Sequence, residues 1–547
     1  MIKSHKEWRS FRVRLSIFLL ALSFCLSAVA SVFAGEMLTG EDVFKYSNAG
    51  AAHGGYYRSN MTAPRSLDPH METYANTTAV THNTNNGLLR INPRMDGVEL
   101  DLAESWKQID ALTYEFKIRK GVRWQDVPPV NGRELTSADI KYSIERVAGM
   151  HGQKSHFKHR YYFENTLASI ETPDKYTIIF KTKKPFAPFI SYIASPWTAI
   201  VAKEVVDEFK DLKRKAIGTG PFILKEFVRG SHIIMVKNPN YFKKNRPYLD
   251  KIQLKIMRDP AAVVSAFIAG KLDSTGAYFF QIPTIKKQSP EARIVRREGT
   301  HMWTLRCPPW IEGTKPLKPP FDKKKVRQAI AMAIDKRKLL KLAWGGFGTP
   351  QIGPVTNALK KYALPESAQV EYNPEKARKY LAESGYPNGF TAELITWNLP
   401  YMTKPAQVLK EMLGDVGIKI NLKTLEMAQY FNRAYRFDYE MALHVMTAPT
   451  DPEEMLTPYF GKVDTSTFYK WSDHDIWAMI EKQSSIMDPE ERVAYINKIQ
   501  RKIVDESPNV FLYTQYRYSV SRPYVHHKYY LLDFQPFYAE FTWMEKH

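Results

Sequence analysis

The stretch PYLDKIQLKIMRDPAAVVSAFIAGKLDSTGAY, residues 247–278, carries the clearest structural pattern of this 547-residue chain. Its apolar residues at 252, 254 and 256 alternate with polar ones, which predicts a strand with one buried face. Asp259 and Pro260 predict the start of a helix, because aspartate caps a first turn and proline there lacks only an unneeded N–H. Gly270 predicts its end, since glycine readily adopts the left-handed conformation of a helix C-cap.

A second strand is predicted at 271–275, so the stretch forms a strand–helix–strand crossover unit of a mostly parallel sheet. Such sheets bind ligands beyond the carboxyl ends of their strands. At that point the chain has Gly276, Ala277 and Tyr278, and we expect these residues to line a cleft. The alternative is an ordinary α/β segment without a site.

The rest of the chain continues this α/β pattern. A helix over 136–147 is predicted to be capped by Thr136, with Asp139 as its capping-box partner. Residues 216–242 predict a β-hairpin. In the second half, Asp322 is predicted to cap a helix within 321–340.

Two further helical signals follow in the second half. Asn373 and Pro374 predict the start of another helix, and Gly385 predicts its end. Residues 391–425 predict strand, helix and strand, a second crossover unit. The proline-rich segment 298–320 is where we expect one lobe to end and the other to begin.

Residues 1–34 have the pattern of a cleavable secretory signal: a basic start, an apolar run, and small residues for cleavage after Ala30 or Ala34. An uncleaved membrane anchor is the alternative, because the apolar run is about long enough to span a bilayer. We expect no lipid anchor at Cys25, since the bulky Phe24 precedes it. Cys307 is then the one cysteine left, which excludes an intrachain disulfide.

Composition and motifs exclude several other functions. The formal net charge is +21, yet no basic run or nucleic-acid-binding motif accompanies it, so we expect no nucleic-acid partner. The sequence has no HExxH motif, GxSxG motif, P-loop or His/Cys spacing typical of zinc. We therefore expect no catalytic residues, no metal site and no cofactor.

Nine segments, taken in chain order, resemble the extracytoplasmic solute-binding proteins of ABC importers, peptide/nickel class, known as solute-binding protein family 5. The segments are SLDP (66–69), LAESWKQIDALTYEFKIRKGVRW (102–124), NGRELTSADIKYSIERV (131–147), GTGPFILKEF (218–227), NPNYF (238–242), PYLDKIQLKI with AGKLD (247–273), PPFDKKKVRQAIAMAIDK (319–336), NPEKARKYLAESGYPNG (373–389) and TDPEEML (450–456). They cover nearly the whole mature chain.

This resemblance implies an α/β, two-lobed periplasmic-binding-protein fold of type II, the large class with an extra subdomain in its first lobe. The implied parts are a signal peptide (1–34), lobe I (35–303, with the subdomain at about 79–205), lobe II (304–505) and a return segment completing lobe I (506–547). A hinge closes the lobes around a ligand. The family implies no catalysis, a periplasmic monomer, and the transmembrane subunits of an ABC permease as partner.

The resemblance also implies site residues. The extended segment before SLDP, here Ala63, Pro64 and Arg65, touches the ligand backbone in relatives; a solvated surface arginine is the alternative for Arg65. A second ligand segment comprises Met446, Thr447, Ala448 and Asp451. In peptide-binding relatives an aspartate at the position of Ala448 pairs with the peptide's ammonium group. Either another acid replaces it here, or the ligand has no free N-terminus.

Two more pairs complete the predicted site. Trp397 and Asn398 end a strand beside the cleft, where the tryptophan either stacks on ligand or belongs to the core. Tyr513 and Gln515 lie on the predicted return crossing. We expect the solute to be a peptide or peptide-like. The alternatives are a non-peptide solute (an opine, oligosaccharide or metal-chelate) or a periplasmic sensor or chaperone-like binder.

Overall fold

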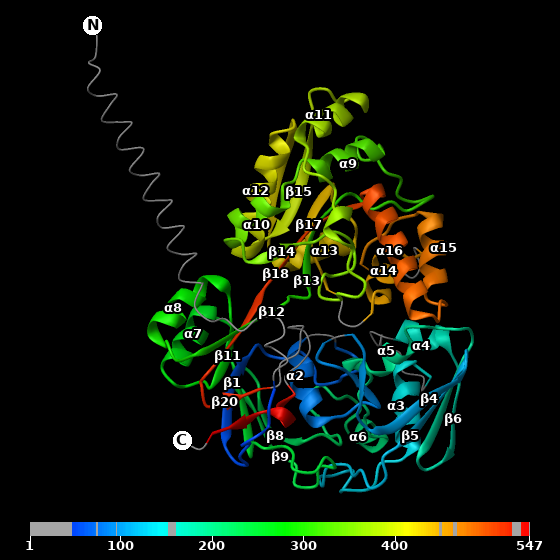
Figure 1. Cartoon of the computed structure of the whole chain (residues 1–547), viewed down its shortest axis with the longest axis vertical. Helices are drawn as coiled ribbons and strands as arrows, with labels where there is room; N and C mark the ends of the chain where they lie inside the picture. Colours follow the sequence, from blue (N-terminus) through cyan, green and yellow to red (C-terminus); the bar gives the residue numbers. More distant parts are fainter. Residues whose placement is uncertain are drawn as a thin grey trace.

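The computed structural model describes residues 46–72, 75–94, 96–150, 160–447, 451–462, 468–527 and 538–545. The predicted signal segment, 1–34, lies outside these residues. The chain forms two lobes, stacked along the long axis of the molecule in Figure 1. Lobe I contains the sheets built from β1 to β12 and β19, and lobe II contains β13 to β18.

Lobe I is built around a four-stranded sheet of order β1-β10-β9-β8. Its strands are β1 (Tyr56–Met61), β10 (Lys251–Ile256), β9 (His232–Lys237) and β8 (Phe222–Val228), and the helix α2 (Ala75–Thr84) contacts β8. β10 is parallel to β1 and antiparallel to β9. The predicted hairpin of residues 216–242 is confirmed as β8 and β9.

A three-stranded sheet of order β11-β19-β12 lies beside it. It consists of β11 (Ser274–Ala277), β19 (Arg517–Ser521) and β12 (Arg293–Arg297), with the helices α7 (Pro260–Ile268) and α8 (Ile282–Gln288). The predicted cap of α7 is confirmed, since the Asp259 carboxylate accepts a hydrogen bond from the Ala261 N–H at 2.8 Å. Gly270 follows the helix with a positive φ of 71°.

The predicted crossover unit at this point is wrong in one respect. β10 and β11 belong to different sheets, and β11 pairs antiparallel with β19. β1, contributed by a distant part of the chain, is hydrogen-bonded to β10 and contacts β11. The sheet of β10 is therefore mixed and the sheet of β11 is antiparallel, so neither is mostly parallel.

The remainder of lobe I holds a second four-stranded sheet, of order β4-β5-β7-β6. Its elements are β4 (Ala103–Asp110), β5 (Thr113–Ile118), β7 (Thr177–Thr182), β6 (Leu167–Asp174), α3 (Ser137–Val147), α4 (Arg160–Thr166), α5 (Phe189–Ile193) and α6 (Lys203–Phe209). Short strands pair as β2 (Leu89–Ile91) with β3 (Val98–Leu100) and as β20 (Val525–His526) with β21 (Trp543–Met544). The capping box of α3 is confirmed, with the Thr136 N–H donating to Asp139 at 2.9 Å.

Lobe II is built on a six-stranded sheet of order β14-β18-β13-β17-β15-β16. The strands are β13 (His301–Arg306), β14 (Gly348–Pro350), β15 (Phe390–Trp397), β16 (Ile418–Leu425), β17 (Met441–Thr447) and β18 (Asn509–Gln515). The helices are α9 (Lys324–Met332), α10 (Lys336–Trp344), α11 (Pro374–Glu383), α12 (Pro400–Gly414), α13 (Met427–Tyr435), α14 (Glu453–Phe460), α15 (His474–Gln483) and α16 (Pro489–Glu506). Single 3₁₀ turns occur at Pro196–Thr198, Phe279–Gln281, Glu366–Ala368 and Ala539–Phe541.

Most of the local predictions for lobe II are confirmed. β15, α12 and β16 form a crossover unit with parallel strands, and Asn373 caps α11 by accepting from the Lys376 N–H at 2.9 Å. The cap predicted at Asp322 is wrong, because the residue before α9 is Lys323. The stretch 321–340 also contains two helices, since Asp335 caps α10 by accepting from the Lys338 N–H at 2.9 Å.

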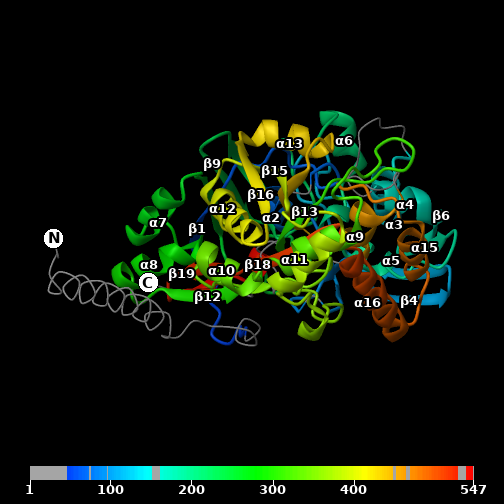
Figure 2. The same ribbon diagram turned by 90° about the horizontal axis from the view of Figure 1, so that it is seen from above.

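Two short crossings join the lobes. The chain passes from β12 to β13 through residues 298–300, and returns from β18 to β19 through residue 516. In Figure 1 the red strand β18 runs down from lobe II toward β12 and β11. Figure 2 shows α7 and α8 toward one end of the molecule, and α4, α15 and α16 toward the other.

The lobes also touch on the side away from these crossings, where α5 lies below α14 and α15 in Figure 1. The Ala187 N–H of lobe I donates to the Ser484 carbonyl of lobe II at 2.7 Å. One buried apolar cluster includes Phe163 of lobe I and Met455 of lobe II. The lobes are therefore in contact on this side as well as joined by the two crossings.

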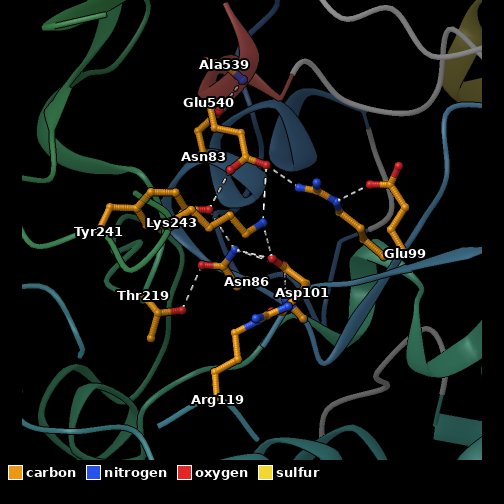
Figure 3. A network of polar contacts seen from close by, with 12 residues as sticks. Asn83, Asn86, Glu99, Asp101, Arg119, Thr219, Tyr241, Lys243, Ala539 and Glu540 are labelled. Atoms are coloured by element: carbon orange, nitrogen blue, oxygen red, sulfur yellow. Dashed lines mark hydrogen bonds and ion pairs between the residues drawn. The ribbon is translucent and has the colours of Figure 1, made fainter. Parts of the chain in front are cut away.

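A buried polar network fastens the C-terminal segment to lobe I (Figure 3). The Glu540 carboxylate pairs with Arg90 and accepts a hydrogen bond from the Tyr241 hydroxyl at 2.8 Å. Lys243 links Glu540 to Asp101, with a distance of 2.6 Å from its Nζ to the Asp101 carboxylate. The Glu540 side chain therefore holds together segments that are far apart in the sequence.

Candidate functional site

One edge of the lobe II sheet faces lobe I. β15 runs parallel to β17, while β13 is antiparallel to both β17 and β18. The carboxyl ends of β15, β17 and β18, at Trp397, Thr447 and Gln515, therefore lie on the same edge. Since β18 continues into lobe I directly after Gln515, this edge is directed toward the other lobe.

A matching edge occurs in lobe I. β1 and β10 are parallel, and β1 also runs beside β11. Ser59 Oγ donates to the Ser274 carbonyl at 3.0 Å, and Thr275 Oγ1 donates to Asn60 Oδ1 at 2.7 Å. The carboxyl ends of these three strands consequently lie together. This arrangement places the predicted segments 63–65 and 276–278 at one edge of the lobe, where open α/β sheets bind ligands.

The second predicted ligand segment lies partly outside the described residues. Met446 is buried in β17, and Thr447 pairs through its backbone with His301 at the edge facing lobe I. Ala448 lies outside the described residues. Asp451 is buried and forms an ion pair with Arg492 at 2.7 Å, and it accepts a hydrogen bond from the Glu453 N–H at 2.8 Å. Its carboxylate is therefore occupied within lobe II.

The predicted aromatic residues of lobe II lie mainly in its core. The Trp397 side chain is 6% exposed and packs edge-on against Tyr430, with ring centroids 4.7 Å apart. Tyr513 is fully buried, accepts a hydrogen bond from Trp344 Nε1 at 2.8 Å, and stacks on Trp303. This packing matches the core alternative for Trp397.

The remaining predicted residues differ in exposure. Asn398 and Gly276 are exposed, while Ala277 and Gln515 are buried. Tyr278 is half-buried, and its ring stacks on that of Phe280 with centroids 5.5 Å apart. Among these five residues, Tyr278 and Asn398 thus present polar side chains that are accessible to a solute.

A cavity of about 610 Å³ opens at the carboxyl edge of the four-stranded lobe I sheet. The predicted residues Ala63, Pro64 and Arg65 form one side of it. The remaining lining residues are Lys213, Arg214, Phe227, Arg229, Gly230, Ile256 and Arg258. Its volume is within the range of small-molecule sites.

Five of the cavity's lining residues are cationic, and none is acidic. Lys213 pairs with Asp211 at 3.1 Å. Arg214, Arg229 and Arg258 make no hydrogen bond or ion pair with any residue that the structure describes. Sequence reasoning identified Arg65 but missed the other four cations. The available signal was a basic residue directly after a predicted strand, at Arg258, and another in the hairpin turn, at Arg229.

Among the described residues, no group of three or more His, Cys, Asp or Glu side chains is placed to hold a metal ion. Across the same ranges no helix combines the length and the apolar character needed to cross a bilayer.

Comparisons with known proteins agree with this architecture. Residues 97–467 match the model described as bacterial extracellular solute-binding proteins, family 5 Middle. The glutathione-binding protein GsiB of Salmonella choleraesuis is 27% identical over 474 residues, covering 82% of this chain and 86% of that protein.

Solved structures give the same result for the fold. Helicobacter pylori DppA in complex with the peptide STSA superposes with a TM-score of 0.76 at 24% identity, covering 90% of this chain and 99% of that one. AgaA of A. tumefaciens R10, in complex with agropinic acid, has a TM-score of 0.72 at 26% identity, with the same coverage of both chains. These structures share the architecture described above.

Proposed function

Since this chain belongs to the bacterial extracellular solute-binding proteins of family 5, a non-enzymatic family of ABC transport, we propose that it captures a peptide or peptide-like solute. The predicted two-lobed periplasmic-binding-protein fold is confirmed. We infer that the solute lies between the lobes and that the closed protein delivers it to the membrane subunits of an ABC importer. The proposal depends chiefly on one observation: strand ends of both lobes face each other beside two short crossings.

This geometry explains how a bound ligand can control whether the lobes are open or closed. A solute that contacts both edges makes its full set of contacts only when the lobes are closed. Binding therefore shifts the population toward the closed form, and the crossings at 298–300 and 516 act as the hinge. A permease that recognises the closed form then distinguishes loaded protein from empty protein.

The solute class follows from relatives and from the site. GsiB binds glutathione, and DppA was solved with the peptide STSA. The segment 63–65 continues from β1 at the cavity, where an extended peptide can lie along it. The complex of AgaA with agropinic acid supports the alternative of a non-peptide solute such as an opine. The absence of an acid at residue 448 favours a ligand without a free ammonium group at that point.

The proposal includes the organisation inferred from the sequence: a cleaved signal at 1–34, export to the periplasm, a monomeric state, lobe I at 35–303, lobe II at 304–505 and a return segment at 506–547 that completes lobe I. The structure differs from these bounds, because β13 already begins at His301 and the return crossing at residue 516 lies ten residues after 506. The strand β18 (Asn509–Gln515) still belongs to the lobe II sheet, and the crossing follows it.

The test is a thermal-shift and calorimetric titration of the purified protein with tripeptides, their N-acetylated forms, glutathione and agropinic acid. We expect a tripeptide to raise the melting temperature and to compact the protein in solution scattering, and its N-acetylated form to do so at least as strongly. Binding of agropinic acid alone would select the non-peptide alternative. Chemical turnover of a ligand, or the absence of any ligand-dependent closure across the panel, would refute the proposal.

A further inference from the structure

We propose that the cationic cavity of lobe I is a subsite for the anionic end of the solute, a group carrying two or more carboxylates or a phosphate. This inference rests on the proposed function, because it assigns a charge to the solute that the same cleft captures. The cavity lies next to the predicted ligand segment, since Ala63, Pro64 and Arg65 line it.

The cations reach the cavity from separate parts of the chain. Arg65 follows β1, Arg258 follows β10, and Arg229 lies in the turn between β8 and β9. Lys213 and Arg214 belong to the loop before β8, which is tied to the first segment by a hydrogen bond from the Leu67 N–H to the Lys213 carbonyl at 3.0 Å. The fold therefore brings together five positive charges that the sequence keeps apart.

Such a grouping is unfavourable without a counter-ion, because like charges at close range repel. Some cations elsewhere in lobe I have acidic partners: Arg133 pairs with Asp139 at 2.6 Å, and Lys243 with Asp101 at 2.6 Å. In the cavity, Asp211 pairs with Lys213 and also attracts Arg214. An incoming anion would neutralise the charges of Arg229 and Arg258 in particular, so binding energy is available to it.

The chemistry of the cluster specifies the kind of anion. Guanidinium groups form paired hydrogen bonds with carboxylate or phosphate oxygens, and they remain charged at any physiological pH. Arg214, Arg229 and Arg258 make no hydrogen bond or ion pair within the described part of the chain. Several such forks around one cavity match a group with several anionic oxygens better than a single carboxylate.

The walls define the neighbouring part of the solute. Phe227, Ile256 and Pro64 contribute apolar surface to the same cavity. An apolar or uncharged stem can pack there while its anionic end meets the arginines. The preferred solute is accordingly a peptide-like molecule with an acidic end, and not a cationic or neutral peptide.

The experiment compares matched ligands by calorimetry at fixed ionic strength: tripeptides ending in Glu or Asp, the same peptides ending in Gln or Asn, free citrate, and inorganic phosphate. The variants are Arg229→Gln and Arg258→Gln, with Arg337→Gln as control, an exposed lobe II arginine paired with Glu366. We expect acidic peptides to bind about tenfold more tightly than their amides, and each cavity variant to abolish most of that difference. The control is expected to preserve it.

Equal binding of acidic and amide peptides, unchanged in both cavity variants, would overturn the anion subsite while leaving the proposed function intact. Failure of every peptide, with citrate or phosphate still bound in an Arg229- and Arg258-dependent way, would support the subsite and reject the peptide proposal. Binding to phosphatidylglycerol vesicles without binding to any soluble anion would assign the cations to a membrane surface and refute the subsite.

Discussion

Gly299 lies directly against the backbone carbonyl of Gln515, where the two chain crossings pass each other between the lobes. A Cβ atom at residue 299 would overlap that carbonyl oxygen. Gly299 lies between β12 and β13, and Gln515 is the last residue of β18. Any side chain at 299 would therefore separate the two crossings, so a glycine is required by close approach and not by an unusual φ.

The first prediction concerns this contact. Gly299→Ala is expected to lower the free energy of unfolding by about 1–3 kcal/mol, because the added methyl group forces a backbone shift. It is also expected to change the balance of open and closed forms, which solution scattering with and without ligand measures. The control is Gly414→Ala in α12, where an added Cβ meets no atom within 4 Å. Equal stability of the two variants would contradict the proposed tight crossing.

The second prediction separates a structural role from a ligand role for Asp451. Asp451 and Arg492 form a buried ion pair at 2.7 Å. Asp451→Asn leaves the Arg492 charge without its partner and is expected to destabilise the protein by about 3–5 kcal/mol in urea unfolding. In an Arg492→Met background the same change is expected to cost much less. If Asp451→Asn kept full stability but lost ligand affinity, Asp451 would instead be a ligand-binding residue.

The structural elements that the sequence predicted well are specified by neighbouring residues. Asp259 caps α7 and Asn373 caps α11, and each does so through a hydrogen bond to a residue two or three positions later. The crossover unit from β15 to β16 was predictable because its strands are close in sequence and directly paired.

The features that were missed depend on distant residues. β1 lies between β10 and β11 although nearly 200 residues separate it from them in the sequence. The local pattern of apolar residues predicts a strand but does not predict which distant strand it pairs with. The cationic cavity has the same origin, since Arg65, Arg229 and Arg258 meet only after the sheet has formed. Asp335 was overlooked as a cap because the apolar pattern continues across it.

The third prediction tests the buried network of Figure 3. Although burial opposes ionisation, Lys243 and Arg90 hold the pKa of Glu540 well below its usual range. A depressed pKa of this kind stabilises the fold fully above the unfolded-state pKa, near 4.3, and this stabilisation is lost only below that value, as the pH falls toward the folded-state pKa. Glu540→Gln is expected to cost about 3–5 kcal/mol at pH 7, because Lys243 and Arg90 lose their shared partner. Urea unfolding at pH 7, pH 4 and pH 3 measures it.

The control for this network is Glu545→Gln, which removes an exposed carboxylate in the same C-terminal segment, paired with His526 at 2.8 Å. Its cost is expected to stay below about 1 kcal/mol. The loss caused by Glu540→Gln should also stay nearly constant from pH 7 to about pH 4 and shrink below it. A loss that is independent of pH would show that the charge of Glu540 does not stabilise the segment.

The last prediction concerns Lys336, the first residue of α10. Its side chain is buried and donates a hydrogen bond to the Gln351 carbonyl at 2.8 Å, and burial lowers its pKa to about 7. The folded protein thus binds fewer protons than the unfolded chain between pH 7 and the unfolded-state pKa of about 10.4. Stability is therefore expected to rise with pH across this window, and the cost of the buried charge is greatest below pH 7.

Lys336→Met removes this cost together with one hydrogen bond worth about 1 kcal/mol. We expect the variant to be more stable than the parent protein at pH 6, by an amount on the order of a few kcal/mol, with the difference declining toward pH 10. Lys338→Met, at an exposed position of the same helix, controls for the general effect of losing a lysine and should show no such trend. Urea unfolding from pH 6 to pH 10 measures the stability of all three proteins. Parallel curves of stability against pH for Lys336→Met and the parent would refute the lowered pKa of Lys336. A lysine that stays protonated in the folded state binds as many protons there as in the unfolded chain, so it cannot make stability depend on pH.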